Sequence, residues 1–320
     1  MCYSIASLSS AEDAATLDRI WAASQDADDR GFRPHDGWWF LSAWAGRAAL
    51  LASIDAPIGG LAVHQAPDGA LEARLALRPD RRTPEAAHRL VQAAREEAEV
   101  SGSPLLRLTL PAGASWAREA AAAAGLTVAR ATLVMRRPAA HGPLPAADVP
   151  GIHIRPLAPG EEGRLLHALN HAWAGTWNFR PLTRRVLERD LAHQRDGFRI
   201  AVNAEGRIVG TVHAQHNPEG KDPDGTPYTW IANLTTAPGW RGQGLGCALL
   251  SAGIAALHAR GAQSVTLGVD SGAAAPLTLY RSAGFTEIDR LELWEAQAGR
   301  LIAGDQRLRC QGDAAGLQAA

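Results

Sequence analysis

The sequence predicts an α/β fold used twice, with two tandem domains that each hold a mixed central sheet flanked by helices. Three observations predict it. Segments with the two-residue period of strands alternate with segments of helical period, a proline-rich stretch divides the chain near its middle, and parts of the two halves resemble each other. The 320 residues suffice for two domains of about 150 residues each. With 46% apolar and 20% charged residues, both domains can bury a core.

The composition excludes several classes of protein. Acidic and basic residues nearly cancel, 33 against 32, whereas proteins that bind nucleic acid usually carry a basic excess. Three isolated cysteines form neither a disulfide framework nor a CxxC metal site, so no metal is expected. Residues 1–20 lack a signal-peptide pattern, and no apolar run approaches the ~18 residues of a membrane span. We expect a cytoplasmic monomer or homodimer with no membrane or nucleic-acid partner.

The domain boundary is predicted at Pro138 to Pro150, where four prolines in thirteen residues are typical of a linker. The predicted domains are therefore 1–137 and 151–300, followed by a tail at 301–320. The alternating segment Leu126 to Arg136 is predicted to be the last strand of the first domain.

A weak internal repeat supports duplication of one domain. Ala124-Gly125-Leu126-Thr127 aligns with Ala283-Gly284-Phe285-Thr286, and at the same spacing Arg82 aligns with Arg241. Further upstream, matching residues of the two halves are separated by fewer positions. A polar insertion at 217–226, predicted to be a long hairpin loop, accounts for this difference in spacing.

The elements of the second half follow in order from period and punctuation. Acidic residues at 161 and 162 suit the start of a helix, Pro181 precedes another, and Gly261 and Gly284 are typical of helix ends. We predict strands at 152–155, 198–202, 208–216, 228–236, 265–270 and 285–294, and helices at 161–173, 182–192, 244–260 and 274–282.

A glycine-rich turn carries the main functional signal. Arg241-Gly242-Gln243-Gly244-Leu245-Gly246 follows a predicted strand and opens a helix. Glycine allows positive φ and removes side chains that would keep a ligand from the backbone. Successive N–H groups and the helix dipole then favour a phosphate or pyrophosphate. The spacing fits neither GxxxxGK[ST] nor a dinucleotide GxGxxG fingerprint.

The spacing does fit [QR]xxGx[GA], filled by Arg241, Gly244 and Gly246. Downstream, Ala273 to Phe285 matches a helix pattern with Leu279-Tyr280 followed by Ala283-Gly284-Phe285. Loop, helix, strand and tyrosine-bearing helix in this order resemble the GCN5-related N-acetyltransferase (GNAT) superfamily, over Ile152 to Trp294.

This resemblance implies an N-acetyltransferase that moves acetyl from the cosubstrate acetyl-CoA directly to a primary amine of a small molecule. By the same resemblance, Tyr280 donates to the CoA sulfur, and backbone N–H groups near the end of the strand polarise the thioester carbonyl. The implied acetyl-CoA positions are Leu234, Thr235, Thr236, Arg241, Gly242, Gln243, Gly244, Leu245, Gly246, Ala273 and Tyr280.

The general base is less clearly marked, because the strand 228–236 holds no carboxylate. The candidates are His213 or His216, with the neutral-pH titration typical of histidine, and Asp270 at a strand end. The two histidines face opposite sides of a strand, so only one of them can reach the site, and a water-mediated base is the alternative. For the acceptor amine, the family uses the two helices after the first strand. We predict a substrate pocket there from aromatic and basic side chains, together with a strand histidine, at Trp173, Trp177, Phe179, Arg180 and His216.

Several departures bear on function. Family members often have Asn where this chain has Ala273. In the first half, Arg82-Thr83-Pro84-Glu85-Ala86 lacks the glycines, and Ala121 replaces the tyrosine, so this domain is not expected to bind acetyl-CoA. The tandem arrangement resembles mycothiol synthase, which leaves acetylation of a cysteinyl amine as an alternative. A non-catalytic acyl-CoA sensor and an enzyme acting on proteins or peptides also remain open.

Overall fold

The computed structural model describes residues 3–28, 47–52, 56–145, 148–177, 179–221 and 227–298. These residues form two compact units. The first holds the described residues up to Ala129 together with those from Glu292 onward, and the second holds Arg130 to Leu291. Each unit contains sheet strands and helices in the predicted succession, which confirms the α/β architecture.

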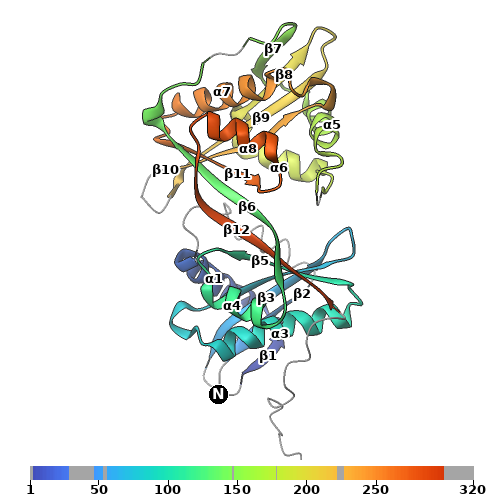
Figure 1. The fold of residues 1–320 in the computed structure, drawn as a ribbon, viewed down its shortest axis with the longest axis vertical. Coiled ribbons are helices and arrows are strands. Elements are labelled where there is room, and N and C mark those ends of the chain that lie inside the picture. The colour runs from blue at the N-terminus through green and yellow to red at the C-terminus, as the bar shows by residue number, and fades with distance from the viewer. Residues whose placement is uncertain are drawn as a thin grey trace, which may run out of the picture. The chain divides into compact units, whose positions relative to one another are not determined.

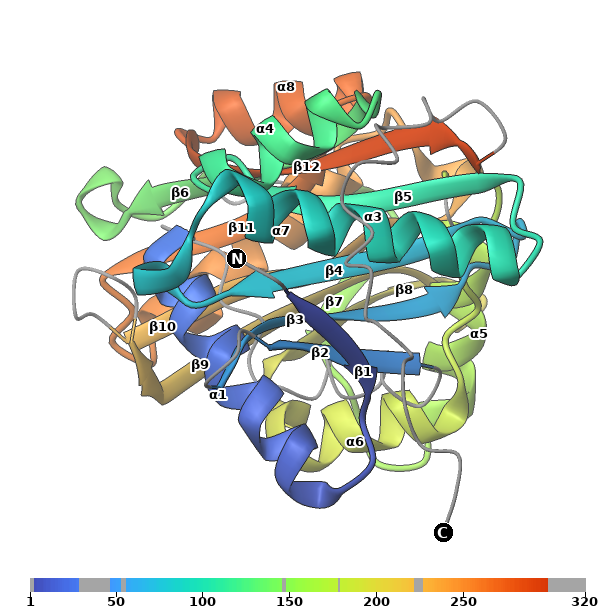
Figure 2. The same ribbon diagram turned by 90° about the horizontal axis from the view of Figure 1, so that it is seen from below.

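The first unit is a sheet in the order β1-β2-β3-β4-β5-β12. Side chains of β3 alternate between its two faces: Leu61 and Val63 pack with Leu90 of α3, whereas Ala62 packs with Leu17 of α1. Figure 2 shows α1 and α3 on opposite faces of this sheet. The elements are β1 Ser4–Ser7, α1 Ala11–Asp28, β2 Arg47–Ala52, β3 Pro57–Gln65, β4 Leu71–Leu77, η1 Pro79–Arg81, α3 Pro84–Val100, β5 Leu105–Pro111 and α4 Ser115–Ala123.

The second unit is a sheet in the order β6-β11-β10-β9-β8-β7. Its elements begin and end within a few residues of the predicted positions, so the secondary structure predicted for this half is confirmed. They are β6 Thr127–Pro138, η2 Ala139–His141, β7 Ile152–Pro156, α5 Glu162–Trp173, α6 Arg184–Gln194, η3 Arg195–Gly197, β8 Phe198–Asn203, β9 Ile208–Lys221, β10 Pro227–Thr236, η4 Pro238–Trp240, α7 Leu245–His258, β11 Ser264–Asp270 and α8 Ala274–Ser282. Strand β12, Thr286–Gln297, belongs to this unit as far as Leu291 and to the first unit from Glu292.

Helices cover both faces of the second sheet, and each face has its own core. Val212 and Ala214 pack against α7 and α8, whereas Phe198 and Ile200 pack against α5 and α6. In Figure 1, α7 and α8 are the orange and red helices, and α5 and α6 are the yellow-green ones. The site described below lies where the loops of these four helices meet the ends of β10 and β11.

Two strands depart from the predicted domain division. The segment Leu126 to Arg136 was expected to close the first domain, but from Thr132 to Pro138 it pairs antiparallel with β11. Conversely, Trp294 of β12 is buried in the core of the first unit. This expectation was wrong because the period of a strand shows that it is half-buried but not which sheet it joins. The compact units therefore differ in extent from the predicted ranges 1–137 and 151–300.

The remaining expectations concern connecting segments. The predicted linker 138–150 lies within the second unit and carries the short η2 turn in its described part. The Ala139 N–H donates to the Gln263 carbonyl at 2.9 Å, and Val149 is buried, so this segment packs on that unit. The insertion at 217–226 extends the β9–β10 hairpin, with Asn217 opposite Tyr228, and residues 222–226 lie outside the described residues. The tail at 301–320 and the cysteines Cys2 and Cys310 lie outside them as well. Among the described residues, no helix combines the length and apolar character needed to cross a membrane.

Candidate active site

Strands β10 and β11 part at the centre of the second unit. They are paired in parallel only at Trp230↔Thr266 and Ile231↔Leu267, although β10 continues to Thr236 and β11 to Asp270. Beyond Ile231, the edge of β10 that faces β11 has no ladder partner on that strand. Backbone groups on such an open edge can hydrogen-bond an extended ligand.

A β-bulge lies on β10 just after the strands part. The register with β9 shifts between Ala232 and Thr235, and Asn233 has φ of 49°, a left-handed conformation that asparagine tolerates better than most residues. The Thr211 hydroxyl, 2.8 Å from both the Asn233 carbonyl and the Thr235 hydroxyl, holds the bulge. The bulge takes Asn233 and Leu234 out of the regular ladder.

The glycine-rich turn joins β10 to α7. Gly242 and Gly244 have φ of 75° and 84°, and a Cβ built on either meets no atom within 4 Å. Gly244 is the N-cap of α7, and the Ala248 N–H makes the first hydrogen bond of the helix, to the Gly244 carbonyl at 3.1 Å. The N–H groups of the first turn therefore have no acceptor within the helix, and the space beside Gly242 and Gly244 is open. An anion such as a pyrophosphate fits this arrangement.

Two polar side chains of the turn hold the turn itself. Arg241 donates to the carbonyls of Thr236 at 3.3 Å and Ala172 at 3.0 Å. Gln243 donates to the Gly239 carbonyl at 3.0 Å. Arg241 and Gln243 are implied acetyl-CoA positions through the backbone of the turn, and their side chains have protein partners that fix this backbone.

Tyr280 lies on α8, next to this turn. A Cβ on Gly246 would meet Leu279 Cδ2 at 3.5 Å, so α8 packs closely on the start of α7. The Tyr280 ring is buried and meets Phe285 edge-on at 5.9 Å, and burial raises its pKa to about 12. Ala273, at the N-cap of α8, contributes only its backbone, whose N–H donates to the Asp270 carbonyl at 2.9 Å.

His213, a predicted base, lies in the core. It is fully buried, stacks on Phe198 at 3.7 Å, and has Gln194 O and Gln215 Nε2 each 3.2 Å from its two ring nitrogens. Burial lowers its pKa to about 3. With both nitrogens occupied and no solvent access, this ring is not placed to accept a proton from an amine.

Asp270, the other predicted base, is held in an ion pair. Both of its carboxylate oxygens accept from Arg130 Nε, at 2.7 and 2.8 Å, and one accepts from the Gly272 N–H at 2.8 Å. The Arg130 guanidinium lies 4.9 Å from the centre of the Trp177 ring. This carboxylate thus supports the wall of the cavity described next, through Arg130.

The predicted acceptor residues come together in one cavity of about 290 Å³. Trp173, Trp177, Phe179 and Arg180 all line it. His216 does not: it pairs with Thr229, at the opposite end of β10 from the bulge. The cavity is completed by residues that were not predicted to line it: Leu169, Asn170, Thr176, Leu182 and Asn233.

Two of these missed residues shape the cavity. Asn170 exchanges hydrogen bonds with the backbone of Leu182, at 2.7 and 3.0 Å, which ties the loop after α5 back onto that helix. Asn233 brings the cavity to the strand bulge. No sequence pattern marked either residue. The only available signal was that Asn233, near the end of its strand, is a residue type that tolerates positive φ. Within the described ranges, no three His, Cys, Asp or Glu side chains gather as a metal-binding group.

The corresponding turn of the first unit is closed by its own side chains. Thr83 caps α3 by accepting from the Ala86 N–H at 3.2 Å, and Tyr3 lies 3.1 Å from the same Thr83 hydroxyl. Pro84 has no N–H, and the Glu85 side chain adds a carboxylate to the first turn. None of the features that open the turn at Gly242 and Gly244 is repeated here.

Comparison with known proteins agrees with this arrangement. Residues 164–285 match the acetyltransferase (GNAT) family. The chain is 41% identical over 180 residues to a mycothiol acetyltransferase of Thermobispora bispora, an alignment that covers 52% of this chain and 57% of that protein. It is 34% identical over 258 residues to a mycothiol acetyltransferase of Thermomonospora curvata, covering 77% of this chain and 82% of that one.

A solved structure shows the same fold over nearly the whole chain. The structure of a tandem GNAT protein from the clavulanic acid biosynthesis pathway superimposes with a TM-score of 0.65 at 18% identity, covering 93% of this chain and 99% of that one. The family match, the relatives and the shared fold agree with one another. The chain belongs to the acetyltransferase (GNAT) family.

Proposed function

We propose that this protein is an acetyl-CoA-dependent N-acetyltransferase that acetylates a primary amine of a small molecule, with its chemistry in the second unit. The observation that carries the proposal is the meeting of an open strand edge with a helix N-terminus whose glycines adopt positive φ in open space. The open strand edge suits the extended arm of acetyl-CoA, and the helix N-terminus suits its pyrophosphate.

The residues present fit acetyl-CoA without a basic surface. Backbone N–H groups from Gly242 to Gly246 would hold the pyrophosphate, and the backbone around Leu234 would hold the arm and face the thioester carbonyl. When bound, acetyl-CoA supplies the acetyl group as an activated thioester. Donors fixed by a bulge and a helix start are already oriented before the ligand arrives, which favours stabilisation of developing charge on a carbonyl oxygen.

Tyr280 would hold the proton that the leaving sulfur needs. Because burial raises its pKa to about 12, the phenol stays protonated throughout the neutral range. Among the residues that the structure describes, we find no hydrogen-bond partner for its hydroxyl, so the proton at Oη is available to a ligand. A phenol held protonated and oriented beside the turn is suited to general-acid catalysis.

The acceptor amine would enter at the cavity beside Asn233. No carboxylate stands among the described residues that line this cavity, and Arg180 is basic. Such a cavity disfavours an ammonium ion, so the amine should arrive uncharged. At pH 7.5 an α-amine with a pKa near 7.8 is about one-third neutral, compared with about a thousandth for an alkylamine near 10.4.

Mycothiol synthase activity, the acetylation of a cysteinyl amine, is the second candidate. It is supported by the two relatives described as mycothiol acetyltransferases. The preference argued above for a weakly basic amine also supports it, because a cysteinyl amine is an α-amine. The two candidates share every proposed residue and differ only in the acceptor.

Formation of the N-acetylated product from acetyl-CoA and a single amine, measured by mass spectrometry, tests the proposal. We expect turnover with cysteinamide and glycinamide, and turnover slower by two orders of magnitude or more with butylamine at pH 7.5. Saturable acetyl-CoA binding without turnover on any amine would contradict the enzymatic proposal and favour an acyl-CoA sensor.

A further inference from the structure

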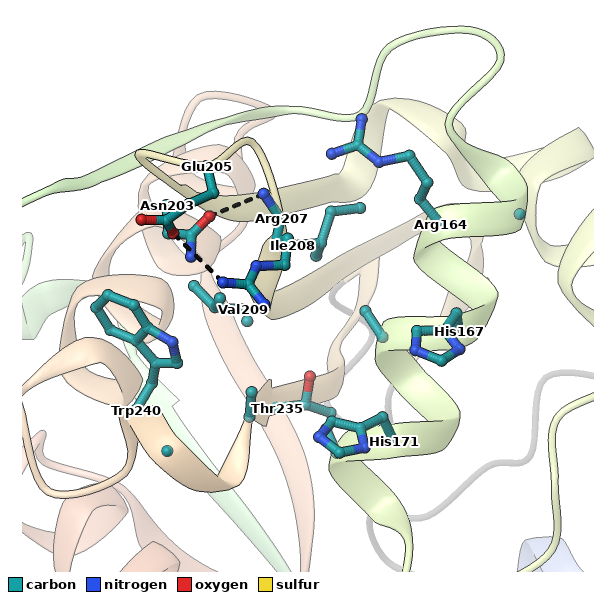
Figure 3. A pocket seen from close by; sticks show the side chains of 16 residues that line it. Arg164, His167, His171, Asn203, Glu205, Arg207, Ile208, Val209, Thr235 and Trp240 are labelled. Carbon is teal, nitrogen blue, oxygen red and sulfur yellow. Dashed lines mark hydrogen bonds and ion pairs between the residues drawn. The ribbon is translucent and has the colours of Figure 1, made fainter.

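A second cavity in the second unit shares only Thr235 with the implied acetyl-CoA positions. Its volume is about 650 Å³, within the range of small-molecule sites, and it lies between α5, the β8–β9 turn and the start of the glycine-rich turn. Figure 3 shows Arg164, His167 and His171 along one side of it and Trp240 on the other. The acceptor cavity is lined by other residues of α5, so the two cavities use different faces of this helix.

The rim of this cavity is cationic. Two guanidinium groups, Arg164 and Arg207, line it together with a single carboxylate, Glu205. The Arg207–Glu205 contact is long, at 3.7 Å, and both side chains are mostly exposed. An exposed pair of this kind contributes little free energy, so Arg207 can turn to an incoming anion at small cost.

The backbone that carries Arg207 is rigid. The Asn203 side chain accepts from the Arg207 N–H at 2.8 Å, and the Asn203 N–H donates to the Arg207 carbonyl at 3.0 Å. Arg164 donates to the Gly206 carbonyl of the same turn and also pairs with Glu161 at 2.8 Å. The two arginines therefore meet at the β8–β9 turn, where the backbone of Arg207 is fixed, which lowers the ordering cost of binding.

The interior of the cavity is apolar and aromatic. Ala168, Ala172, Ile208 and Val209 form part of the lining, beside the indole of Trp240. The imidazoles of His167 and His171, on successive turns of α5, are parallel, with centres 6.2 Å apart. A ligand that uses the whole site therefore needs an apolar body, which covers this surface, and a negative charge, which binds the two arginines.

We propose that this cavity binds a small organic oxyanion, a carboxylate or phosphate attached to a planar apolar body. The oxyanion would accept hydrogen bonds from Arg207 and Arg164, and the body would pack between Trp240 and the histidine face of α5. Guanidinium groups bind both kinds of oxyanion in the same forked geometry, so the rim alone does not separate them. The site goes beyond the proposed acetyl transfer and does not depend on it.

Binding of benzoate, measured by calorimetry or ligand-observed NMR with the full chain and saturating CoA, tests the proposal. Benzamide is the matched control, because it has the same shape without the charge. We expect benzamide to bind at least about tenfold more weakly, as loss of a charge-assisted pair predicts. Phenyl phosphate is the second probe, and its affinity relative to benzoate identifies the preferred oxyanion.

Two variants locate the site. Arg207→Gln should weaken benzoate binding about tenfold, whereas Arg184→Gln, which removes an arginine that is 82% exposed on α6, should not change it. Ala168→Phe fills the cavity without altering charge and should abolish binding, with circular dichroism as the check of folding. Equal affinity for benzoate and benzamide, equal affinity of the two arginine variants, or affinity that falls in proportion to the CoA concentration would overturn the proposal.

Discussion

Arg241 donates a hydrogen bond from Nη2 to the carbonyl oxygen of Ala172 over 3.0 Å, and so joins the glycine-rich turn to the end of α5. The first unit repeats this contact: Arg82 donates to the carbonyl of Ser24, at the end of α1, over 3.3 Å. The two arginines align in the internal repeat. Because the contact persists where the glycines are lost, we infer that this arginine positions the turn in both units and is not primarily a ligand of phosphate.

We therefore expect Arg241→Gln to act on the turn. Two hydrogen bonds to backbone carbonyls are lost, each contributing about 1 kcal/mol, so acetyl-CoA should bind roughly tenfold more weakly and the unfolding temperature should fall by a few degrees. Calorimetry and thermal unfolding check both. Arg184→Gln is the control, because its side chain is exposed and its partner Glu188 is also on the surface. Weaker binding of acetyl-CoA without any loss of stability would instead indicate a direct contact with the ligand.

Tyr280→Phe separates chemistry from binding. The variant keeps the ring against Phe285 and removes only the hydroxyl, so acetyl-CoA affinity should change less than about threefold while kcat falls by 10²-fold or more, as expected for loss of a general acid. Steady-state kinetics and calorimetry measure the two. Tyr3→Phe removes a hydroxyl from the first unit and should leave both quantities unchanged. A Tyr280→Phe enzyme with wild-type turnover would exclude the proton-donor role.

Gly244→Glu should abolish acetyl-CoA binding. Its φ of 84° disfavours any side chain, and a carboxylate at the start of α7 would compete with a pyrophosphate for the same N–H groups. Gly102→Glu is a matched control, because Gly102 also has positive φ, 66°, and an equally open Cβ position, but lies after α3 in the first unit. Equal acetyl-CoA affinity in the two variants would show that the turn has been assigned wrongly.

Most of the local structure could be predicted from the sequence, because helix ends and turns depend on residues that are neighbours in the chain. Helix α8 and the turn before α7 begin and end where Gly and Ala-rich patterns indicated, and the four aromatic and basic acceptor residues share one cavity. The bulge at Asn233 was not predictable, since it depends on Thr211 from another strand.

Long-range partners account for the other differences. Asp270 forms an ion pair with Arg130, which is 140 residues away in the sequence. His213 packs on Phe198 and contacts the carbonyl of Gln194. On an alternating strand, a buried histidine and an accessible one have the same sequence pattern. Likewise, β6 shows the period of a strand but gives no sign that β11 is its partner.

His213 makes stability depend on pH between 6.5 and about 3. Burial lowers its folded-state pKa to about 3, so below pH 6.5 the unfolded chain takes up a proton that the folded chain does not. Stability should therefore fall with decreasing pH, by up to about 1.4 kcal/mol per pH unit from this group. Thermal unfolding from pH 7 to pH 5 measures it. His213→Gln should be less stable at pH 7 but have a shallower slope, whereas His153→Gln, at an exposed position of β7, should keep the wild-type slope. A wild-type slope in His213→Gln would contradict this account.

The chain should bind one acetyl-CoA and not two. In the first unit, the start of α3 already has its cap in Thr83, and the backbone N–H of Glu85 together with the Thr83 hydroxyl lowers the pKa of the Glu85 carboxyl, which keeps that charge in the first turn. Arg82 is paired with the buried Asp28 at 2.7 Å, so a pyrophosphate would meet a carboxylate and no free N–H cluster. Calorimetric titration should give a stoichiometry of one for the wild type and none for Gly244→Glu. A site that persists in Gly244→Glu would place acetyl-CoA in the first unit, and its sensitivity to Glu85→Gln would then show whether that carboxylate opposes binding.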